Sequence, residues 1–263
     1  MEKKKYAVFT LVTENFFEPA NVMIYSFLQN NKWFDGDIVI ICTNDDFFGL
    51  RKDSRDYFVK RYGDMIKFRD VNLVEYYGIL QNITKNKLPT KTFIYYFKFE
   101  MFKEDEYDVK LYLDSDIVVN ANIEELFRNC TDKFLVVEDP CIRLAKYFNS
   151  GVLVAPKSAI PEGFYKTLMN AAETFDESFF KNIGSAKGHF GEQDIYNELI
   201  TEKEFIGEEY NFSPKSYHSD LENNKIFHYC GAEKPWNNKP RIRPADTLYH
   251  WYYYAMIHNF NKK

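Results

Sequence analysis

The sequence contains few cysteines, and their positions exclude two common ways of stabilising a chain. Only four cysteines are spread over 263 residues, namely Cys42, Cys130, Cys141 and Cys230. They form neither a C-x-x-C pair nor a dense cluster, so the spacing predicts neither a structural zinc site nor a disulfide framework. Cysteines used in this sparse way are typical of a reducing compartment, and we therefore expect a cytoplasmic protein.

Long apolar runs are also missing. The N-terminal segment MEKKKYAVFTLVTENFF has a short apolar stretch that Thr10, Thr13 and Glu14 interrupt, and it shows no small-residue cleavage site. No later segment approaches the roughly 20 apolar residues that a membrane-crossing helix needs. We expect the first segment to form a strand, and the protein to be soluble or attached peripherally to the inner face of a membrane.

An excess of positive charge is absent too. The formal net charge is -5 at pH 7, and no run of lysines and arginines is long enough to contact a polyanion. The sequence therefore predicts no nucleic-acid partner. Internal repeats and linkers rich in proline, glycine and serine are also lacking, so we expect a single domain over residues 1–263.

What the sequence does contain is the composition and alternation of an α/β protein. Hydrophobic residues make up 45% and charged residues 28%, which is typical of a globular chain. We expect strands at 6–12, 37–42, 65–71, 110–119, 134–138, 148–155 and 225–229. We expect helices from Pro19, over about 48–62, over 91–103, over about 161–180 and from near Gly191. The alternation predicts a Rossmann-like mixed, mostly parallel sheet flanked by helices, with ligands at the carboxyl ends of the strands.

Two carboxylates interrupt one of the apolar runs. In KLYLDSDIVV, Asp114, Ser115 and Asp116 separate two β-type segments. Residues i and i+2 of an extended chain point to the same face, so Asp114 and Asp116 can converge on one cation, which carboxylate oxygens bind well. Taken alone, the pattern also fits two solvated acids in a turn between strands. The motif therefore predicts a cation site only where other residues support it.

A second apolar run ends in a histidine. In KIFHYCGAEKPW, His228 is followed by Gly231, which lets a backbone approach a ligand closely, and by Lys234, which offers a point charge to a phosphate. An imidazole beside two carboxylates suits manganese better than magnesium or calcium. Taken alone, His228 also fits a structural or exposed histidine, and Lys234 a surface lysine before a turn.

Two further segments carry polar side chains beside a glycine. In FNSGVLVAP, Asn149 precedes a β-type run, and its amide can both donate and accept hydrogen bonds with sugar hydroxyls. In HFGEQDIYN, Glu192, Gln193 and Asp194 follow a glycine where a helix is expected to begin. Asn149 also fits an ordinary turn, and the two acids also fit a first helical turn, where negative charge is favourable.

Together and in this order, these segments resemble glycosyltransferase family 8, the family of glycogenin and of bacterial lipopolysaccharide galactosyl- and glucosyltransferases. The resemblance extends from LVTENFF to KPW, over most of the chain. YLDSDIVV is similar to the D-x-D strand of the family, FNSGV to its sugar-side asparagine segment, and HYCGAEKPW to its H-x-x-G-x-x-K-P-W signature. The resemblance implies a GT-A fold, a divalent metal that is usually manganese, a nucleotide-sugar donor that is usually UDP-linked, and retention of anomeric configuration.

The resemblance also implies roles for individual residues. The implied metal ligands are Asp114, Asp116 and His228. The implied donor-binding residues are Leu11, Thr13, Phe17, Lys98, Ser115, Gly231 and Lys234. The implied residues at the donor sugar and the reaction centre are Asp139, Asn149, Glu192, Gln193 and Asp194. On this basis, residues 1–120 form the nucleotide-binding half and residues 121–263 the half that binds sugar and acceptor.

Two residues depart from the family pattern. Glu192 stands where the family commonly has aspartate before glutamine, which affects the positioning of the sugar hydroxyls. Glu14 stands where shorter polar residues are common, which weakens the case for a uracil contact there. Gln193 would be a poor covalent nucleophile because an amide oxygen is neutral. We therefore expect retention by attack on the same face of the sugar, without a glycosyl-enzyme intermediate.

The expected activity is hexosyl transfer from a UDP-sugar, with UDP-glucose or UDP-galactose favoured, to a glycan, glycolipid or protein acceptor. One alternative is an inactive glycan-binding or scaffold protein of the same fold. Another is a sugar nucleotidyltransferase, although LVTENFFEPAN lacks the glycine-rich, basic loop of such enzymes. The final segment TLYHWYYYAMIHNFNKK fits a helix that packs its aromatic residues onto the domain, and it also fits a peripheral membrane contact.

Overall fold

The structure is a computed structural model that describes most of the chain. The described residues are 5–139, 146–176, 179, 191–214, 220–237 and 243–260. Cys141 and the last part of the helix expected over 161–180 lie outside them. Among the described residues, no helix combines the length and the apolar character that a bilayer crossing requires.

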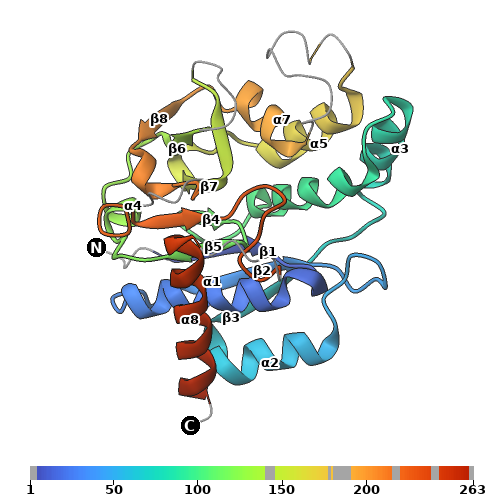
Figure 1. Ribbon diagram of the computed structural model, residues 1–263. Coiled ribbons are helices and arrows are strands. Elements are labelled where there is room, and N and C mark those ends of the chain that lie inside the picture. Colours follow the sequence, from blue (N-terminus) through green and yellow to red (C-terminus); the bar gives the residue numbers. More distant parts are fainter. Residues whose placement is uncertain are drawn as a thin grey trace.

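A seven-stranded sheet forms the centre of the molecule, in the order β3-β2-β1-β4-β7-β6-β8 (Figure 1). Its strands are β1 (Tyr6–Leu11), β2 (Asp37–Cys42), β3 (Ile66–Asp70), β4 (Val109–Leu113), β6 (Phe134–Glu138), β7 (Phe148–Pro156) and β8 (Lys203–Ile206). Strand β7 runs antiparallel to β4 and β6, whereas the other neighbouring strands pair in parallel. The mostly parallel sheet predicted from the sequence is thus confirmed.

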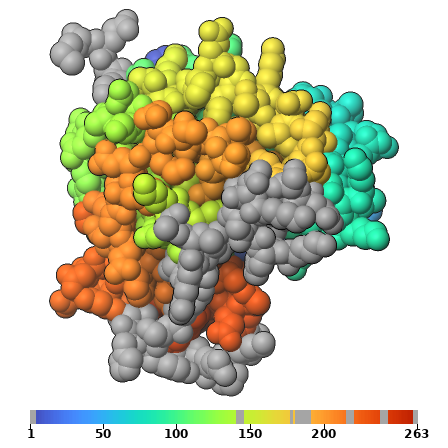
Figure 2. Space-filling model, turned by 90° about the horizontal axis from the view of Figure 1, so that it is seen from above, coloured from blue at the N-terminus to red at the C-terminus, as the bar shows by residue number. Residues whose placement is uncertain are grey.

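Helices cover both faces of this sheet (Figure 1). One face carries α1 (Phe17–Asn30) and α2 (Lys52–Tyr62). The other carries α3 (Tyr77–Lys85), the 3₁₀ helix η3 (Thr90–Phe102), α5 (Phe164–Thr174) and α7 (Glu192–Leu199). Successive strand residues point to opposite faces, so Val8 packs with α1 while Phe9 packs with η3. Figure 2 looks onto the side that α5 and α7 cover, with α3 at its edge.

A second, two-stranded antiparallel sheet joins β5 (Ile117–Val119) and β9 (Ile226–His228). The C-terminal helix α8 (Pro244–Phe260) crosses α1 and packs Tyr249, Tyr252 and Met256 into one apolar cluster with both strands (Figure 1). The aromatic C-terminal segment is therefore a helix that buries part of its aromatic residues. Its Trp251 and Tyr254 side chains are 61% and 67% exposed, and the membrane contact stays a prediction.

Several short elements complete the described structure. They are η1 (Glu14–Phe16), η2 (Gly63–Met65), α4 (Glu125–Arg128), η4 (Lys157–Ala159) and η5 (Glu208–Tyr210). The sequence analysis did not predict α3, β8 or these short helices. The residues of β8 are half-buried or exposed, so its sequence lacks the apolar alternation that would have indicated a strand.

The helix expected over 91–103 is a 3₁₀ helix rather than an α-helix. Aromatic and β-branched residues fill this segment, and such residues lose side-chain freedom in an α-helix. Three residues per turn align Phe93, Tyr96, Phe99 and Phe102 along one edge, and all four are buried. The 3₁₀ geometry thus gives this stretch one continuous apolar edge against the sheet.

Replacing Phe27 by alanine tests the packing of α1 on the sheet. Phe27 is fully buried and its ring meets that of Phe34 edge to face at 4.9 Å. We expect Phe27→Ala to lower the free energy of unfolding by about 3–5 kcal/mol, because the truncation leaves a cavity. Phe47→Ala is the matched control, since Phe47 is 91% exposed and should change stability by less than about 0.5 kcal/mol. Equal losses in urea denaturation would contradict this packing.

Candidate active site

The two aspartates of the D-x-D motif lie where the chain leaves the central sheet. Asp114 follows β4, Asp116 precedes β5, and Ser115 between them is buried. The segment is a turn and not the continuous extended strand from which we predicted convergence of the carboxylates. The turn arises because β5 departs to pair with β9, while the Asp114 amide still donates to the Gly151 carbonyl in β7 at 2.9 Å. The two carboxylates converge nevertheless, through a different backbone geometry.

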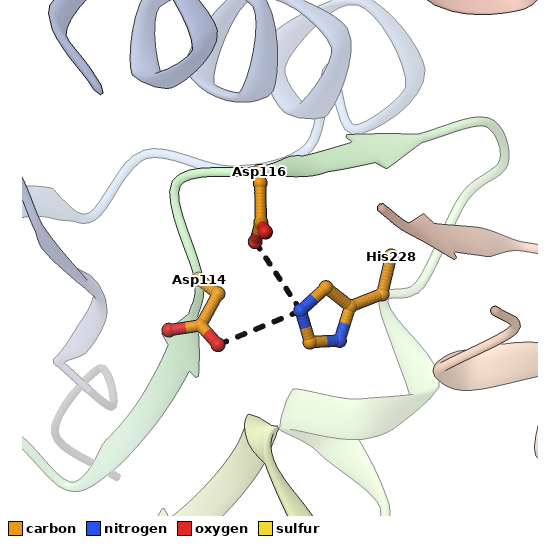
Figure 3. Close-up of side chains that lie close together, drawn as sticks. All are labelled: Asp114, Asp116 and His228. Carbon is orange, nitrogen blue, oxygen red and sulfur yellow. Dashed lines mark ion pairs between the residues drawn. The ribbon is translucent and has the colours of Figure 1, made fainter. Parts of the chain in front are cut away.

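His228 faces both aspartates from the neighbouring strand. It ends β9, where the register places it opposite Ile117, the residue after Asp116. Its Nε2 atom lies 3.2 Å from Asp116 Oδ1 and 3.6 Å from Asp114 Oδ2 (Figure 3). The backbone pairing of β5 with β9, and not side-chain flexibility, therefore brings the three predicted ligands together.

The donor set of this cluster fits a divalent metal. One ligand atom from each of Asp114, Asp116 and His228 can be chosen so that all lie within 4.8 Å of one another. Two carboxylate oxygens and one imidazole nitrogen form a mixed set that suits a divalent ion of intermediate softness. The predicted metal ligands are thus assembled in one place, and a divalent metal is compatible with them.

Two lysines neutralise the carboxylates of the cluster. Lys98, from η3, lies 2.9 Å from Asp114 Oδ1 and 2.7 Å from Glu192 Oε1. Lys234 contacts Asp116 Oδ2 and donates to the Tyr229 carbonyl at 2.6 Å. These positive charges lie where a nucleotide diphosphate next to a bound metal would need them.

Charged neighbours shift the pKa values of Lys98 and Asp116. Burial acts to lower the pKa of Lys98, but the charges of Asp114 and Glu192 outweigh it and raise that pKa above its usual value. Burial acts to raise the pKa of Asp116, but His228 and Lys234 hold it well below its usual range. Both groups are therefore charged throughout the physiological pH range.

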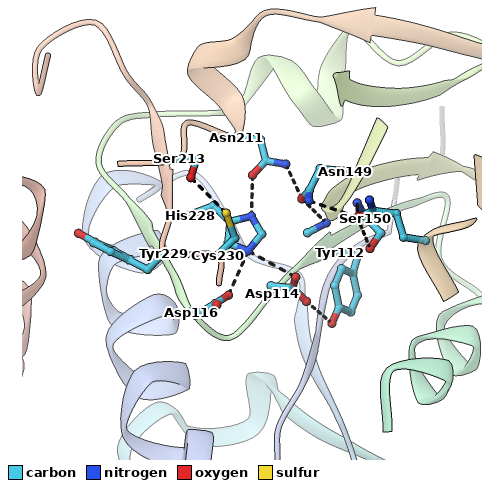
Figure 4. A network of polar contacts seen from close by, with 12 residues as sticks. Tyr112, Asp114, Asp116, Asn149, Ser150, Asn211, Ser213, His228, Tyr229 and Cys230 are labelled. Atoms are coloured by element: carbon cyan, nitrogen blue, oxygen red, sulfur yellow. Dashed lines mark hydrogen bonds and ion pairs between the residues drawn. The ribbon is translucent and has the colours of Figure 1, made fainter. Parts of the chain in front are cut away.

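Amide side chains form a network beside the metal cluster (Figure 4). Asn149 Nδ2 donates to Asp139 Oδ2 at 3.1 Å and to Gln193 Oε1 at 3.2 Å, and Gln193 Nε2 donates to Asp139 Oδ2 at 2.9 Å. Ser150 hydrogen-bonds to Gln193 through its backbone amide and to Glu192 through its hydroxyl. Four of the sugar-side residues predicted from the resemblance, Asp139, Asn149, Glu192 and Gln193, thus come together from the end of β6, from β7 and from α7.

Asp194, predicted with this group, lies further inside the protein. It is fully buried and accepts a hydrogen bond from the Tyr147 hydroxyl. A cavity of about 290 Å³ adjoins the network, and Asp139, Asn211, Phe205 and Glu208 are among its lining residues. Asp139 therefore belongs both to the amide network and to the wall of a cavity.

The residues predicted on the nucleotide side follow β1. Leu11 ends the strand and Thr13 lies just beyond it, half-buried. The Glu14 carboxylate accepts hydrogen bonds from the Arg51 amide and the Ser54 hydroxyl at 2.9 Å, so it is held at the start of α2. The role of Glu14 toward a nucleotide stays a prediction.

Two neighbouring phenylalanines after β1 face different surroundings. Phe17, one of the implied donor-binding residues, packs edge to face on Tyr57 and Phe58 at 5.3 Å, between α1 and α2. Phe16 lies instead beside Trp236, and the Lys234 ammonium is 5.9 Å from its ring centre. Phe16 is thus the aromatic ring nearer to the predicted diphosphate side.

The glycine of the histidine motif adopts a conformation that other residues rarely take. Gly231 has a φ of 88°, in the left-handed region that favours glycine. A Cβ atom at this position would meet no heavy atom of the described residues within 4 Å. The reason for glycine here is therefore the backbone turn between His228 and Lys234, and the open space leaves room for a ligand.

Sequence reasoning missed three residues that the structure brings to the site. Asn211 hydrogen-bonds to His228 Nδ1 at 2.8 Å, and the Tyr112 hydroxyl donates to Asp114 Oδ1 at 2.9 Å. Phe16 is the third. Tyr112 belongs to the apolar run before Asp114, and its place two residues earlier on the same strand face was a usable signal. Asn211 lies in a segment without periodicity or motif, so the single sequence offered no signal for it.

Comparisons with known proteins agree with this geometry. The sequence pattern of Glycosyl transferase family 8 matches residues 7–239. Among curated relatives, Uncharacterized protein R707 of Acanthamoeba polyphaga mimivirus is 24% identical, over 98% of this chain and 94% of that protein. Galactinol synthase 2 of Solanum lycopersicum is 28% identical, over 54% of this chain and 49% of that protein.

A solved structure shows the same fold. The galactosyltransferase LgtC, in complex with donor and acceptor sugar analogs, superposes with a TM-score of 0.72 at 18% identity, over 95% of each chain. The predicted GT-A fold is thereby confirmed. At 18% identity the similarity concerns the fold alone. The side-chain contacts described above are those of this protein.

Removing the Lys98 ammonium tests the charge balance of the site. Its side chain and that of Glu192 are only 6% and 5% exposed, so Lys98→Met would remove the ammonium that the carboxylates of Glu192 and Asp114 share. We expect a loss of about 3–5 kcal/mol in the free energy of unfolding near neutral pH. Lys98→Met/Glu192→Gln should recover part of this loss.

Lys52→Met is the matched control for this experiment. Lys52 also pairs with an acid, Asp56, but its side chain is 85% exposed, so its loss should leave the free energy of unfolding close to that of the wild type. If Lys98→Met were as stable as the control, the carboxylates would not depend on Lys98.

Proposed function

Because the chain belongs to glycosyltransferase family 8 and is a glycosyltransferase of the GT-A fold, we propose that it is a manganese-dependent, retaining hexosyltransferase that uses a UDP-sugar donor. The observation that carries this proposal is the convergence of Asp114, Asp116 and His228 between the cationic side chains of Lys98 and Lys234. UDP-glucose and UDP-galactose are the favoured donors, and the name galactinol synthase of one similar protein supports a galactosyl donor.

Asp114, Asp116 and His228 would hold the divalent metal, which when bound supplies positive charge that stabilises the departing diphosphate. Lys234 would bind a diphosphate oxygen, because its ammonium already lies between Asp116 and the rings of Phe16 and Trp236. Ser115 would contribute polar contacts from the turn between the two aspartates. The open space at Gly231 would let the diphosphate approach the backbone.

The nucleotide would bind at the carboxyl end of β1. Leu11 and Thr13 would contact its base and ribose, since parallel sheets of this type bind ligands at that edge. The packing of Phe17 between α1 and α2 leaves Phe16 as the better candidate for an aromatic contact with the nucleotide. We thus propose nucleotide contacts by Leu11, Thr13 and Phe16, all at the end of β1 or in the segment that follows it.

Retention would follow if the acceptor attacks the donor sugar on the same face from which the leaving group departs. Asp194 is buried against Tyr147, Glu192 is paired with Lys98, and Gln193 offers only a neutral amide oxygen. The bond from the anomeric carbon to the diphosphate oxygen would break as the acceptor oxygen bonds to that carbon. The acceptor proton would pass to a diphosphate oxygen, so that no enzyme nucleophile is needed.

The acceptor would enter through the cavity of about 290 Å³ beside the amide network. Asp139 lies at the junction of this cavity and the sugar-side residues, where a carboxylate can orient an incoming hydroxyl. Phe205 and Glu208 offer an apolar face and a hydrogen-bond acceptor, which together suit a sugar ring. We favour a glycan or glycolipid as the acceptor.

A donor screen tests the proposed activity. Purified protein is incubated with UDP-glucose, UDP-galactose, other UDP-sugars and GDP-sugars, with manganese, magnesium or chelator, and nucleotide release is measured. We expect manganese-dependent release from one UDP-hexose, reduced at least about 100-fold in Asp116→Ala because a metal ligand is lost. Asp64→Ala, which removes an exposed acid in η2, is the matched control and should keep full activity. A protein that binds no nucleotide sugar under any condition would instead be an inactive scaffold.

The configuration of the product tests the proposed stereochemistry. We expect NMR of the product to show the anomeric configuration of the donor, and intact-mass measurements during turnover to show no glycosylated protein. A glycosyl adduct on Glu192, Gln193 or Asp194 would overturn same-face attack and favour double displacement. A product of inverted configuration would overturn both same-face attack and double displacement.

A further inference from the structure

Asn211 connects the histidine of the metal cluster to the amides on the sugar side (Figure 4). We propose that Asn211 is a positioning residue, which keeps a proton on Nδ1 of His228 and thereby directs the Nε2 atom toward the metal. The inference rests on the metal site of the proposed function and adds to it a residue that does not itself touch the metal. It is carried by hydrogen bonds whose direction can be worked out.

The contacts of Asn211 are short and lie inside the protein. Asn211 follows η5 and is 3% exposed, and His228 is 4% exposed. Asn211 Oδ1 lies 2.8 Å from His228 Nδ1, and Asn211 Nδ2 donates to Asn149 Oδ1 at 2.9 Å. Buried away from water, these polar groups depend on one another for hydrogen bonds, so breaking one contact leaves an unsatisfied group.

A backbone amide sets the direction of the hydrogen bonds that link Asn149, Asn211 and His228. Asn149 Oδ1 accepts a hydrogen bond from the Gly151 N–H at 2.9 Å, and a backbone N–H can only donate. The Asn149 atom that faces Asn211 is therefore an oxygen, and Asn211 must present its NH₂ group to it. The remaining amide atom of Asn211, the oxygen, then faces His228.

The direction of these bonds fixes the histidine. An amide oxygen only accepts, so His228 Nδ1 must carry the proton of the 2.8 Å contact. This requirement holds whether or not Nε2 is protonated. When the ring is neutral, Nε2 is the nitrogen with the free electron pair, and it is the atom that faces Asp114 and Asp116.

Close packing holds the ring from a second side. A Cβ atom on Gly151 would come within 2.3 Å of His228 Cε1 and 2.7 Å of Nδ1. The imidazole therefore lies directly against the Gly151 backbone, and only a residue without a side chain fits there. Gly151 thus limits the position of the imidazole ring and also supplies the amide that sets the direction of the hydrogen bonds.

The network of hydrogen bonds also continues beyond Asn149. Its Nδ2 group reaches Asp139 and Gln193, so a hydrogen-bonded path joins the metal ligand to the sugar-side residues. Loss of the hydrogen bond between Asn211 Oδ1 and His228 Nδ1 should therefore affect the histidine. A change that spares the oxygen of Asn211 but removes its NH₂ group should affect the sugar side instead.

The experiment compares Asn211→Leu with Asn211→Asp. Leucine removes both hydrogen bonds at similar volume, whereas aspartate keeps an acceptor for Nδ1–H and loses the donor to Asn149. Asn82→Leu is the matched control, because Asn82 is also buried and donates to the Ala172 and Phe175 carbonyls, away from this network. Thermal unfolding identifies the variants that remain folded.

Two readouts that do not depend on activity follow from the proposal. In ¹⁵N NMR of the wild type, we expect a protected proton on His228 Nδ1 both without metal and with cadmium as a diamagnetic probe. In Asn211→Leu the proton should exchange with solvent, and manganese affinity should fall about 10–100-fold. Asn211→Asp should keep the Nδ1 proton and most of the manganese affinity, and Asn82→Leu should match the wild type.

Two results would overturn the proposal. The first is a folded Asn211→Leu protein that keeps both the protected Nδ1 proton and wild-type manganese affinity. The second is an Asn211→Asp protein that loses the Nδ1 proton as Asn211→Leu does. If the wild type binds neither manganese nor cadmium, the proposed metal function fails, and the Nδ1 proton in the metal-free proteins still decides the role of Asn211.

Discussion

The neutralisation of buried negative charge governs how the site is built. Asp116 and Glu192 are 9% and 4% exposed, and such carboxylates are unfavourable inside a protein without counter-charges. Lys98 reaches across from η3 to Asp114 and Glu192, and Lys234 reaches Asp116 from the segment after β9. Charge pairing therefore ties η3, α7 and the C-terminal part of the chain to the turn between β4 and β5.

The same pairing prepares the site for an anionic ligand. If Asp114 and Asp116 hold a divalent cation as proposed, that ion would supply part of the charge balance that the lysines provide, because it would be the larger local charge. Lys98 and Lys234 could then pair with an anionic ligand. The net charge of the protein, -5, gives no general attraction for anions, so the proposed binding of a nucleotide would depend on this local arrangement.

The sequence predicted the sheet, most of its strands and the metal cluster, because these carry strong local patterns. Asp114, Asp116 and His228 each end or interrupt an apolar run, which marks the edge of a sheet. It missed the 3₁₀ form of η3, strand β8 and Asn211. The first depends on how aromatic residues pack against the sheet, the second pairs through its backbone while its side chains stay largely exposed, and the third acts through contacts between residues distant in sequence.

The structure also gives a physical reason for the glutamate that departs from the family pattern. Glu192 begins α7, and from there its carboxylate reaches Lys98 at 2.7 Å and the Ser150 hydroxyl at 2.8 Å. An aspartate on the same backbone would end about 1.5 Å shorter, one carbon–carbon bond, and would not make both contacts. In this chain the carboxylate before Gln193 is thus committed to charge balance, so in the proposed function contact with the sugar would fall to Gln193, Asn149 and Asp139.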